Sequence, residues 1–273
     1  MIAPGAISPF NRASIGDGAA AWTLGRAVKL DGTNDYVLVN NLSGVAVDTD
    51  FFGISCWFKL GAGWPYSAAV LEGLFTSADS GAIKFCFLLM DPLGTTTNFE
   101  FTVYNDAGGS IITLKGNITD ASYSAGDIIH IAAVLASDGA GIGGSARMWV
   151  NGVLNKSNGN QGAKVWLTEF GANTYVGAER LNANRYYQGE IGDITLFGGV
   201  NLTDADVTTL YNAGAGSDPS DIIPTTNMYF WHQYNESPTT TACIDSSSEE
   251  TRTGTLTNFA GGGDADERPE FNP

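Results

Sequence analysis

The sequence has little positive charge, which limits the partners it can have. Lys and Arg total 13 residues against 29 Asp and Glu, giving a formal net charge of −16. So acidic a surface repels phosphate backbones and anionic lipid headgroups, and we expect no binding to nucleic acid. No apolar run reaches the roughly 18 residues that a membrane span needs, so we expect no membrane insertion.

Cysteine is also scarce, and no targeting segment is evident. The three cysteines, at 56, 86 and 243, form neither a disulfide framework nor a zinc-binding pattern. Cys56 and Cys86 lie in apolar, strand-like segments, where buried free thiols are the default and a Cys56–Cys86 bridge is the alternative. The first ten residues lack the basic start and apolar stretch of a signal peptide, so we expect release in a cytosol.

Alternating apolar and polar residues predict strands along most of the chain. Residues 27–39 contain two such runs around an acidic turn, and Asn151-Gly152 between apolar runs is a strong hairpin signal. Predicted strands lie near residues 26–31, 35–40, 52–60, 68–76, 82–90, 98–104, 110–115, 128–136, 145–150, 153–156, 173–178 and 187–197. This spacing predicts an all-β fold, a two-sheet antiparallel β-sandwich.

One short helix is predicted after the last of these strands. Thr203 and Asp206 form a capping box, and Val207, Leu210 and Tyr211 make one apolar stripe. The run that ends at Gly214 should stop the helix.

The composition divides the chain into three parts. Residues 1–25 are predicted to be an N-terminal arm, 26–214 the sandwich, and 215–273 a C-terminal extension. We expect 227–258 to return to the sandwich as edge strands, because sheet edges need covering. The rival interpretation is a free remnant of a second repeat. Residues 261–273 have the composition of a disordered segment.

Three segments carry a resemblance to a known family. They are Leu-Asp-Gly-Thr-Asn-Asp-Tyr-Val (30–37), Met-Trp-Val-Asn-Gly-Val-Leu (148–154) and Gly-Glu-Ile-Gly-Asp-Ile (189–194). In this order they resemble the laminin-G-like jelly roll of the concanavalin A-like lectin/glucanase superfamily. The segment Gly-Thr-Leu-Thr-Asn-Phe (254–259) resembles tails of such modules in phage structural proteins. The resemblance implies a jelly roll with a binding role.

A calcium site is one implication of this resemblance, since many laminin-G-like domains carry calcium on their loops. Asp31, Asn34 and Asp35 crowd one turn with the oxygen ligands that Ca²⁺ prefers. Asp193 matches one of the family's paired aspartates, although Gly192 replaces the other. The alternative is that Asp and Asn are simply turn residues, whose side chains bond their own backbone.

A glucanase mechanism is not expected. The glucanases of the superfamily place their acids on one strand as Glu-x-Asp-x-x-Glu. Here Glu190 is followed by Gly192 and Thr195 at the other two acidic positions. We expect Glu190 and Asp193 to point to opposite faces, so no pair of carboxylates is suited to glycoside hydrolysis. His130 is expected to be a structural imidazole rather than a base.

Aromatic residues in loops are the candidate ligand-binding residues. Loop aromatics stack on sugar rings and anchor protein interfaces, whereas the alternative is that they plug the ends of the sandwich. The candidates are Trp64, Tyr66, Trp166, Tyr186 and Tyr187.

Together these features predict a non-enzymatic structural or adhesive virion protein, such as a phage capsid decoration, head-fibre or tail component. Its expected partners are capsid or tail proteins and host-surface glycans, as a homo-oligomer or bound to a lattice. The alternative is a carbohydrate-binding lectin module of a secreted or surface protein.

Overall fold

A computed structural model of the chain describes most of the predicted sandwich. The described residues are 27–48, 50–64, 72–79, 83–92, 96–104, 110–119, 123–136, 145–159, 168–179, 185–234, 242–247 and 252–259. The predicted arm, the candidate residues Tyr66 and Trp166, and the tail from 261 lie outside them. None of the helices within these ranges has the length and hydropathy needed to cross a membrane.

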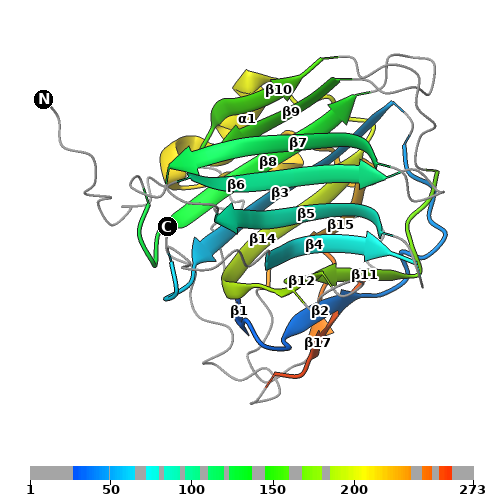
Figure 1. Ribbon diagram of the computed structural model, residues 1–273. Coiled ribbons are helices and arrows are strands. Elements are labelled where there is room, and N and C mark those ends of the chain that lie inside the picture. The colour runs from blue at the N-terminus through cyan, green and yellow to red at the C-terminus, as the bar shows by residue number, and fades with distance from the viewer. Residues whose placement is uncertain are drawn as a thin grey trace, which may run out of the picture.

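Two antiparallel sheets form the fold, as the sequence predicts (Figure 1). The seven-stranded sheet has the order β1-β14-β3-β8-β9-β10, with β15 also paired to β14. Its strands are β1 (Val28–Asp31), β3 (Phe51–Leu60), β8 (Ile128–Ala136), β9 (Ser145–Val150), β10 (Val153–Asn158), β14 (Gln188–Gly198) and β15 (Met228–His232).

The ten-stranded sheet has the order β16-β17-β2-β11-β4-β5-β6-β7, and β12 and β13 join it beside β4. Its strands are β2 (Tyr36–Val39), β4 (Glu72–Ala78), β5 (Ile83–Pro92), β6 (Thr96–Tyr104), β7 (Ser110–Thr119), β11 (Asn173–Val176), β12 (Ala178–Glu179), β13 (Arg185–Tyr186), β16 (Ala242–Cys243) and β17 (Gly254–Thr257).

The main core lies between the sheets and follows the two-residue period of the strands. Ile54, Cys56 and Phe58 of β3 face it, opposite Phe99 and Phe101 of β6. Cys56 is a free buried thiol, as predicted.

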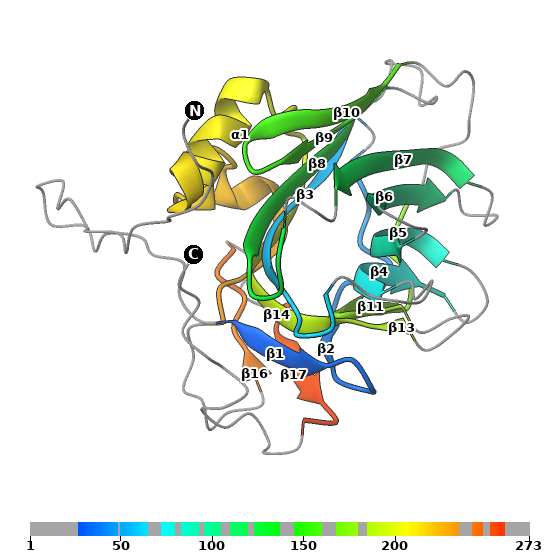
Figure 2. The ribbon, with the colours of Figure 1, turned by 60° about the vertical axis from the view of Figure 1, so that its left-hand side comes forward.

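A second core covers the outer face of the seven-stranded sheet. Helix α1 (Asp204–Tyr211) packs Val207 and Leu210 against Trp149 of β9 and Phe197 of β14. Figure 2 shows α1 on this side of the molecule, with the strands of the other sheet on the opposite side. The helix therefore covers the outer face of the seven-stranded sheet, whereas the ten-stranded sheet carries no helix among the described residues.

The helix cap and the tight turn predicted from the sequence are both present in the structure. Thr203 caps α1 in a capping box with Asp206, and Asn212 ends the helix in a left-handed conformation. Asn151 (φ 48°) and Gly152 (φ 78°) make the tight turn between β9 and β10. The turn at Asp31–Asp35, by contrast, leads from one sheet to the other, because β1 pairs with β14 whereas β2 pairs with β11.

The C-terminal segment pairs with both sheets. β15 pairs with β14 along the same edge as β1, and β17 pairs with β2. Asp245 accepts backbone hydrogen bonds from Trp231 (3.0 Å) and Ser247 (2.9 Å), and Arg252 donates to the carbonyl of Tyr229 (2.7 Å). These contacts join β15 to residues 245–247 and to Arg252.

Candidate functional site

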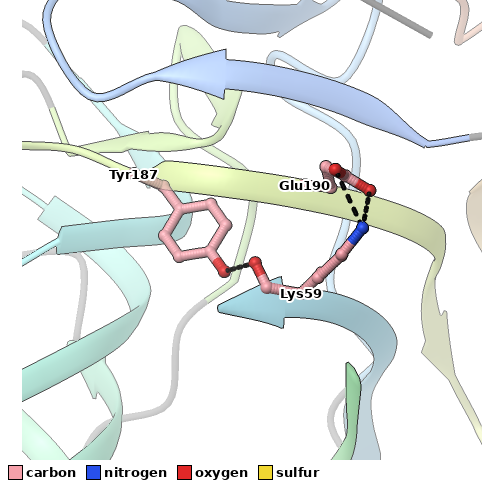
Figure 3. A network of polar contacts seen from close by, with 3 residues as sticks. All are labelled: Lys59, Tyr187 and Glu190. Carbon is pink, nitrogen blue, oxygen red and sulfur yellow. Dashed lines mark hydrogen bonds and ion pairs between the residues drawn. The ribbon is translucent and has the colours of Figure 1, made fainter. Parts of the chain in front are cut away.

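A hydrogen bond from Tyr187, the residue before β14, and an ion pair from Glu190 of β14 both join that segment to Lys59 of β3 at one end of the sandwich (Figure 3). Tyr187 donates its hydroxyl hydrogen to the carbonyl oxygen of Lys59 at 2.5 Å. The Lys59 ammonium in turn lies 3.2 Å and 3.3 Å from the two carboxylate oxygens of Glu190. Cross-strand pairing also places Lys29 of β1 beside Glu190. Glu190, the one acid of the glucanase pattern that this sequence has, is thus paired with the ammonium group of Lys59.

Because of a β-bulge in β14, the side chains of Glu190 and Asp193 do not point in the predicted directions. The register of β14 against β3 shifts between Gly192 and Ile194, so Ile191 and Ile194 both face the main core. The extra residue leaves Asp193 on the outer side with Glu190, so the prediction of opposite faces was wrong. Asp193 is nevertheless sealed beneath Trp231, while Glu190 binds Lys59.

Asp193 has the properties of a buried neutral acid. It is 4% exposed, and its Oδ1 accepts the indole N–H of Trp231 at 2.6 Å. Burial raises its pKa to about 8; the Trp231 hydrogen bond opposes this shift and the charge of Asp218 adds to it. A protonated, enclosed carboxyl is a poor ligand for a cation at neutral pH.

The acidic turn uses its own carboxylates for backbone hydrogen bonds. Asp31 Oδ1 accepts from the N–H groups of Thr33 (2.7 Å) and Asn34 (3.2 Å), and Asp35 Oδ2 accepts from that of Asp31 (3.1 Å). Slight burial raises the pKa of Asp31, but these hydrogen bonds outweigh it and hold the pKa below its usual value. This is the turn chemistry offered as the alternative to calcium.

The structure does not bring Asp193 to this turn. Asp31 pairs with Gln188, which lies five residues before Asp193 on the same strand, a span of about 17 Å. Within the described ranges, no three His, Cys, Asp or Glu side chains are grouped to hold a metal. Calcium at Asp31, Asn34 and Asp35 stays a prediction.

Two of the candidate aromatic residues are buried, so the expectation that they are exposed was wrong for them. Trp64 is 6% exposed and donates its indole N–H to the carbonyl of Tyr123 at 3.1 Å. Tyr187 is fully buried, with its ring against Phe58. Both side chains fill the core at one end of the sandwich, which was the alternative to ligand binding. Tyr186 is half-buried in β13.

His130 is a buried structural residue, as predicted. Its Nε2 lies 3.0 Å from the Ser55 hydroxyl, and its ring contacts Trp57. Burial lowers its pKa to about 3, so the imidazole is neutral at physiological pH. Because the pair is enclosed, it cannot reach a substrate as nucleophile and base.

The outer face of the ten-stranded sheet is accessible toward its two ends and buried in its middle. Thr255, Leu38, Tyr175 and Thr76 face away from the core in register, and beyond β5 Thr102 and Thr113 continue the same row. Thr76 and Thr102 in the middle are buried, whereas Thr255 is exposed and Leu38, Tyr175 and Thr113 are half-buried. The accessible groups therefore lie toward the two ends of this row.

At the β6–β7 end of the row, charged and hydroxyl groups form a network. Lys115 lies 2.9 Å from Glu100, whose other carboxylate oxygen accepts from the Thr102 hydroxyl at 2.9 Å. Thr102 also lies 3.3 Å from the Thr113 hydroxyl. Paired in this way, the side chains present fixed donors and acceptors.

At the β2–β11–β17 end, aromatic and hydroxyl groups lie together. The ring of Tyr36, which is only 7% exposed, meets the ring of the half-buried Tyr175 edge to face, 5.4 Å apart, so Tyr175 is the more accessible of the two. Thr255 and Thr257 of β17 pair with Leu38 and Tyr36. We call this set the tyrosine patch: Tyr36, Leu38, Tyr175, Thr255 and Thr257. None of its residues was predicted as a ligand-binding residue, because they lie on strands rather than in loops; the alternation of Tyr and Thr with apolar residues was the available signal.

Comparison with known proteins agrees with this architecture. A laminin-G-like family model described as the concanavalin A-like lectin/glucanases superfamily matches residues 31–208. A search of curated proteins found no match.

Two solved structures illustrate the shared fold. The native heptameric SAP-like pentraxin from Limulus polyphemus aligns with a TM-score of 0.52 at 16% identity, over 70% of this chain and 84% of that one. A putative carbohydrate binding protein from Bacteroides ovatus aligns with 0.55 at 15% identity, over 87% of this chain and 59% of that one. At these identities the likeness establishes the fold alone.

Proposed function

The chain belongs to the concanavalin A-like lectin/glucanases superfamily, and from this premise we propose that it is a non-enzymatic carbohydrate-binding module. The observation that carries the proposal is the pair of accessible regions toward the two ends of the outer face of the ten-stranded sheet, the tyrosine patch and the hydroxyl network. Sugar rings stack on aromatic side chains and exchange hydrogen bonds with hydroxyl and paired charged groups. The Bacteroides ovatus structure, itself titled a putative carbohydrate binding protein, supports this direction.

The arrangement of acids favours binding over hydrolysis. Hydrolysis needs two carboxyl groups on either side of the scissile bond, one of them free to donate a proton. Glu190 is paired with Lys59, and Asp193 is enclosed under Trp231. The outer face that carries both is covered in part by α1. A substrate would have to displace this cover to reach Asp193.

A glycan array tests the proposal. We expect the chain to bind a subset of glycans, and Tyr175→Ala to weaken that binding about fivefold, since loss of one stacking contact costs on the order of 1 kcal/mol. Tyr211→Ala is the matched control, because it removes a half-buried tyrosine of α1, on the side of the other sheet. No binding to any glycan, or equal losses from both variants, would contradict the proposal.

We propose further that this module serves as an adhesive structural component of a phage virion, in a capsid decoration, head fibre or tail. Support comes from the resemblance of Gly254–Phe259 to phage modules and from the strong negative charge, which disfavours binding to the packaged genome. The alternative is a lectin module of a secreted or surface protein. Copurification with virus particles favours the first assignment, and calcium-dependent glycan binding without particles favours the second.

A further inference from the structure

Beside the tyrosine patch, the side chain of Asn40 is held in one orientation. Asn40 directly follows β2, and its backbone N–H continues the pairing with β17 by donating to the carbonyl of Thr253 at 2.9 Å. Its side-chain Nδ2 donates to the same carbonyl at 2.9 Å and to the hydroxyl oxygen of Thr255 at 3.1 Å. A reversed amide would set two oxygens against each other at Thr253, so this network determines which end of the amide is the oxygen.

Both hydrogens of this amide are thus used, and two other polar functions remain available. Asn40 Oδ1 has no donor among the described residues, and the Thr255 hydroxyl, which accepts from Asn40, has no acceptor there for its own hydrogen. Asn40 is half-buried and Thr255 is exposed. One acceptor and one donor therefore lie side by side on the outer face of the sheet.

This donor–acceptor pair borders the apolar part of the tyrosine patch. Leu38 pairs with Thr255 on one side and with Tyr175 on the other, so two strand spacings, about 10 Å, separate Thr255 from Tyr175. Asn40 lies two residues beyond Leu38 and therefore on the same face. The ring of Tyr36 meets that of Tyr175 edge to face and holds it. A sugar ring placed over Leu38 would lie between the Tyr175 ring and the donor–acceptor pair.

The charged groups of the neighbouring strands lie away from this pair. No residue of the tyrosine patch is charged, and the chain as a whole has a net charge of −16. Arg252 donates to the carbonyl of Tyr229 on β15, in the other sheet. Lys115, paired with Glu100, is on β7, five strand spacings or about 24 Å from β2. A carboxylate at the pair would face the Asn40 oxygen, whereas sites for such groups use Arg or Lys.

We propose, building on the glycan-binding function proposed above, that the tyrosine patch takes a neutral sugar through two adjacent hydroxyl groups. One sugar hydroxyl donates to Asn40 Oδ1, and its neighbour accepts from the hydroxyl of Thr255. A hydroxyl group can both donate and accept, whereas a carboxylate can only accept. Asn40 and Thr255 thus determine the substrate class, and neutral glycans bind in preference to forms that carry sialic or uronic acid.

Titration calorimetry with matched oligosaccharides tests this assignment. The probes are the neutral oligosaccharides that the glycan array selects, the same oligosaccharides capped with sialic acid, and deoxy analogues that each lack one hydroxyl group. We expect the neutral form to bind more tightly than the capped form. Added salt should leave the affinity for the neutral form unchanged, because no ion pair forms.

Two substitutions test the residues themselves. Thr255→Val keeps the shape of the side chain but removes the donor, so it should weaken binding of the neutral form about fivefold, and Asn40→Ala should do the same. With the deoxy analogue that lacks the partner of Thr255, Thr255→Val should have no further effect, a result that general damage to the fold would not give. Thr209→Val is the matched control, since it removes an exposed threonine hydroxyl from α1, on the side of the other sheet.

Three results would overturn this assignment while leaving the glycan-binding function in place. One is tighter binding of the sialylated form. Another is a loss of binding in Tyr175→Ala with none in Thr255→Val or Asn40→Ala. The third is a loss in Thr255→Val that is the same for every deoxy analogue. Failure of the unaltered chain to bind any glycan would contradict both this assignment and the glycan-binding function.

Discussion

The indole of Trp231 donates a hydrogen bond to the carboxyl of Asp193 at 2.6 Å, and this contact joins the C-terminal segment to the body of the sandwich. Trp231 belongs to β15, and its backbone N–H is bonded to Asp245 further along the same segment. Asp193 belongs to β14, at the bulge that turns it outward. One tryptophan thus connects the bulged strand with the residues that continue to β17.

Asp193 should make the stability of the chain depend on pH. Its pKa is about 8 in the folded state, against an ordinary value of 3.8, because burial disfavours the charge. Its contribution is fully present below about pH 4 and is lost as the pH rises through 8, because the folded state must then hold a buried charge. Asp193→Asn should remove this loss, which amounts to a few kcal/mol.

Urea unfolding at pH 6 and pH 9 measures the effect. The unaltered chain should lose stability between these values, and Asp193→Asn should lose less. Asp206→Asn, a change at the exposed cap of α1, serves as a control and should follow the unaltered chain. An equal pH dependence in all three would contradict a buried neutral carboxyl.

The Tyr187 hydroxyl should contribute to stability but not to ligand binding. Tyr187→Phe removes its hydrogen bond to the Lys59 carbonyl and should cost about 1 kcal/mol in the free energy of unfolding. Thermal or urea unfolding gives the stability, and the glycan array gives the binding. A loss of glycan binding without a loss of stability would instead indicate that this end of the sandwich holds the ligand.

Gly152, in the tight turn beneath α1, should not tolerate replacement by a residue with a side chain. A Cβ at Gly152 would lie 2.8 Å from the Tyr211 ring, in a backbone with φ of +78°. Gly126 has φ of +91° and nothing within 4 Å of its Cβ, so Gly126→Ala measures backbone strain alone, about 1 kcal/mol. Gly152→Ala should cost clearly more in urea unfolding. Equal costs would show that Tyr211 moves aside freely.

The calcium prediction concerns the turn from Asp31 to Asp35. If Ca²⁺ binds there, it should stabilise the folded chain by linkage and raise its melting temperature. Asp31→Asn should abolish that rise, whereas Asp50→Asn, at an exposed acid in another loop, should keep it. A melting temperature that calcium leaves unchanged would assign these carboxylates to the turn alone.

Local signals in the sequence predicted much of the fold. The capping box of Thr203, the Asn151-Gly152 turn and the alternation in β3 each depend on near neighbours, and the structure has all three. The bulge at Asp193 was missed because alternation assumes a constant period of two, and nothing near Asp193 indicates an extra residue.

The binding surface was harder to predict than the fold. Trp64 and Tyr187 looked like loop residues, but their burial depends on Tyr123 and Phe58, which are distant in the sequence. The tyrosine patch likewise assembles from β2, β11 and β17, whose pairing no local pattern reveals. Which face of a sheet stays open is decided by where α1 packs, a property of the whole fold.

Hydrogen–deuterium exchange with a bound glycan tests the central claim most directly. We predict slower exchange in β2, β11 and β17, the strands that carry the tyrosine patch, and in β6 and β7, which carry the hydroxyl network at the other end of the row. Exchange in α1 and in residues 59–64 and 187–190 should stay unchanged. Protection confined to that end of the sandwich, or to the face under α1, would contradict binding on the open sheet.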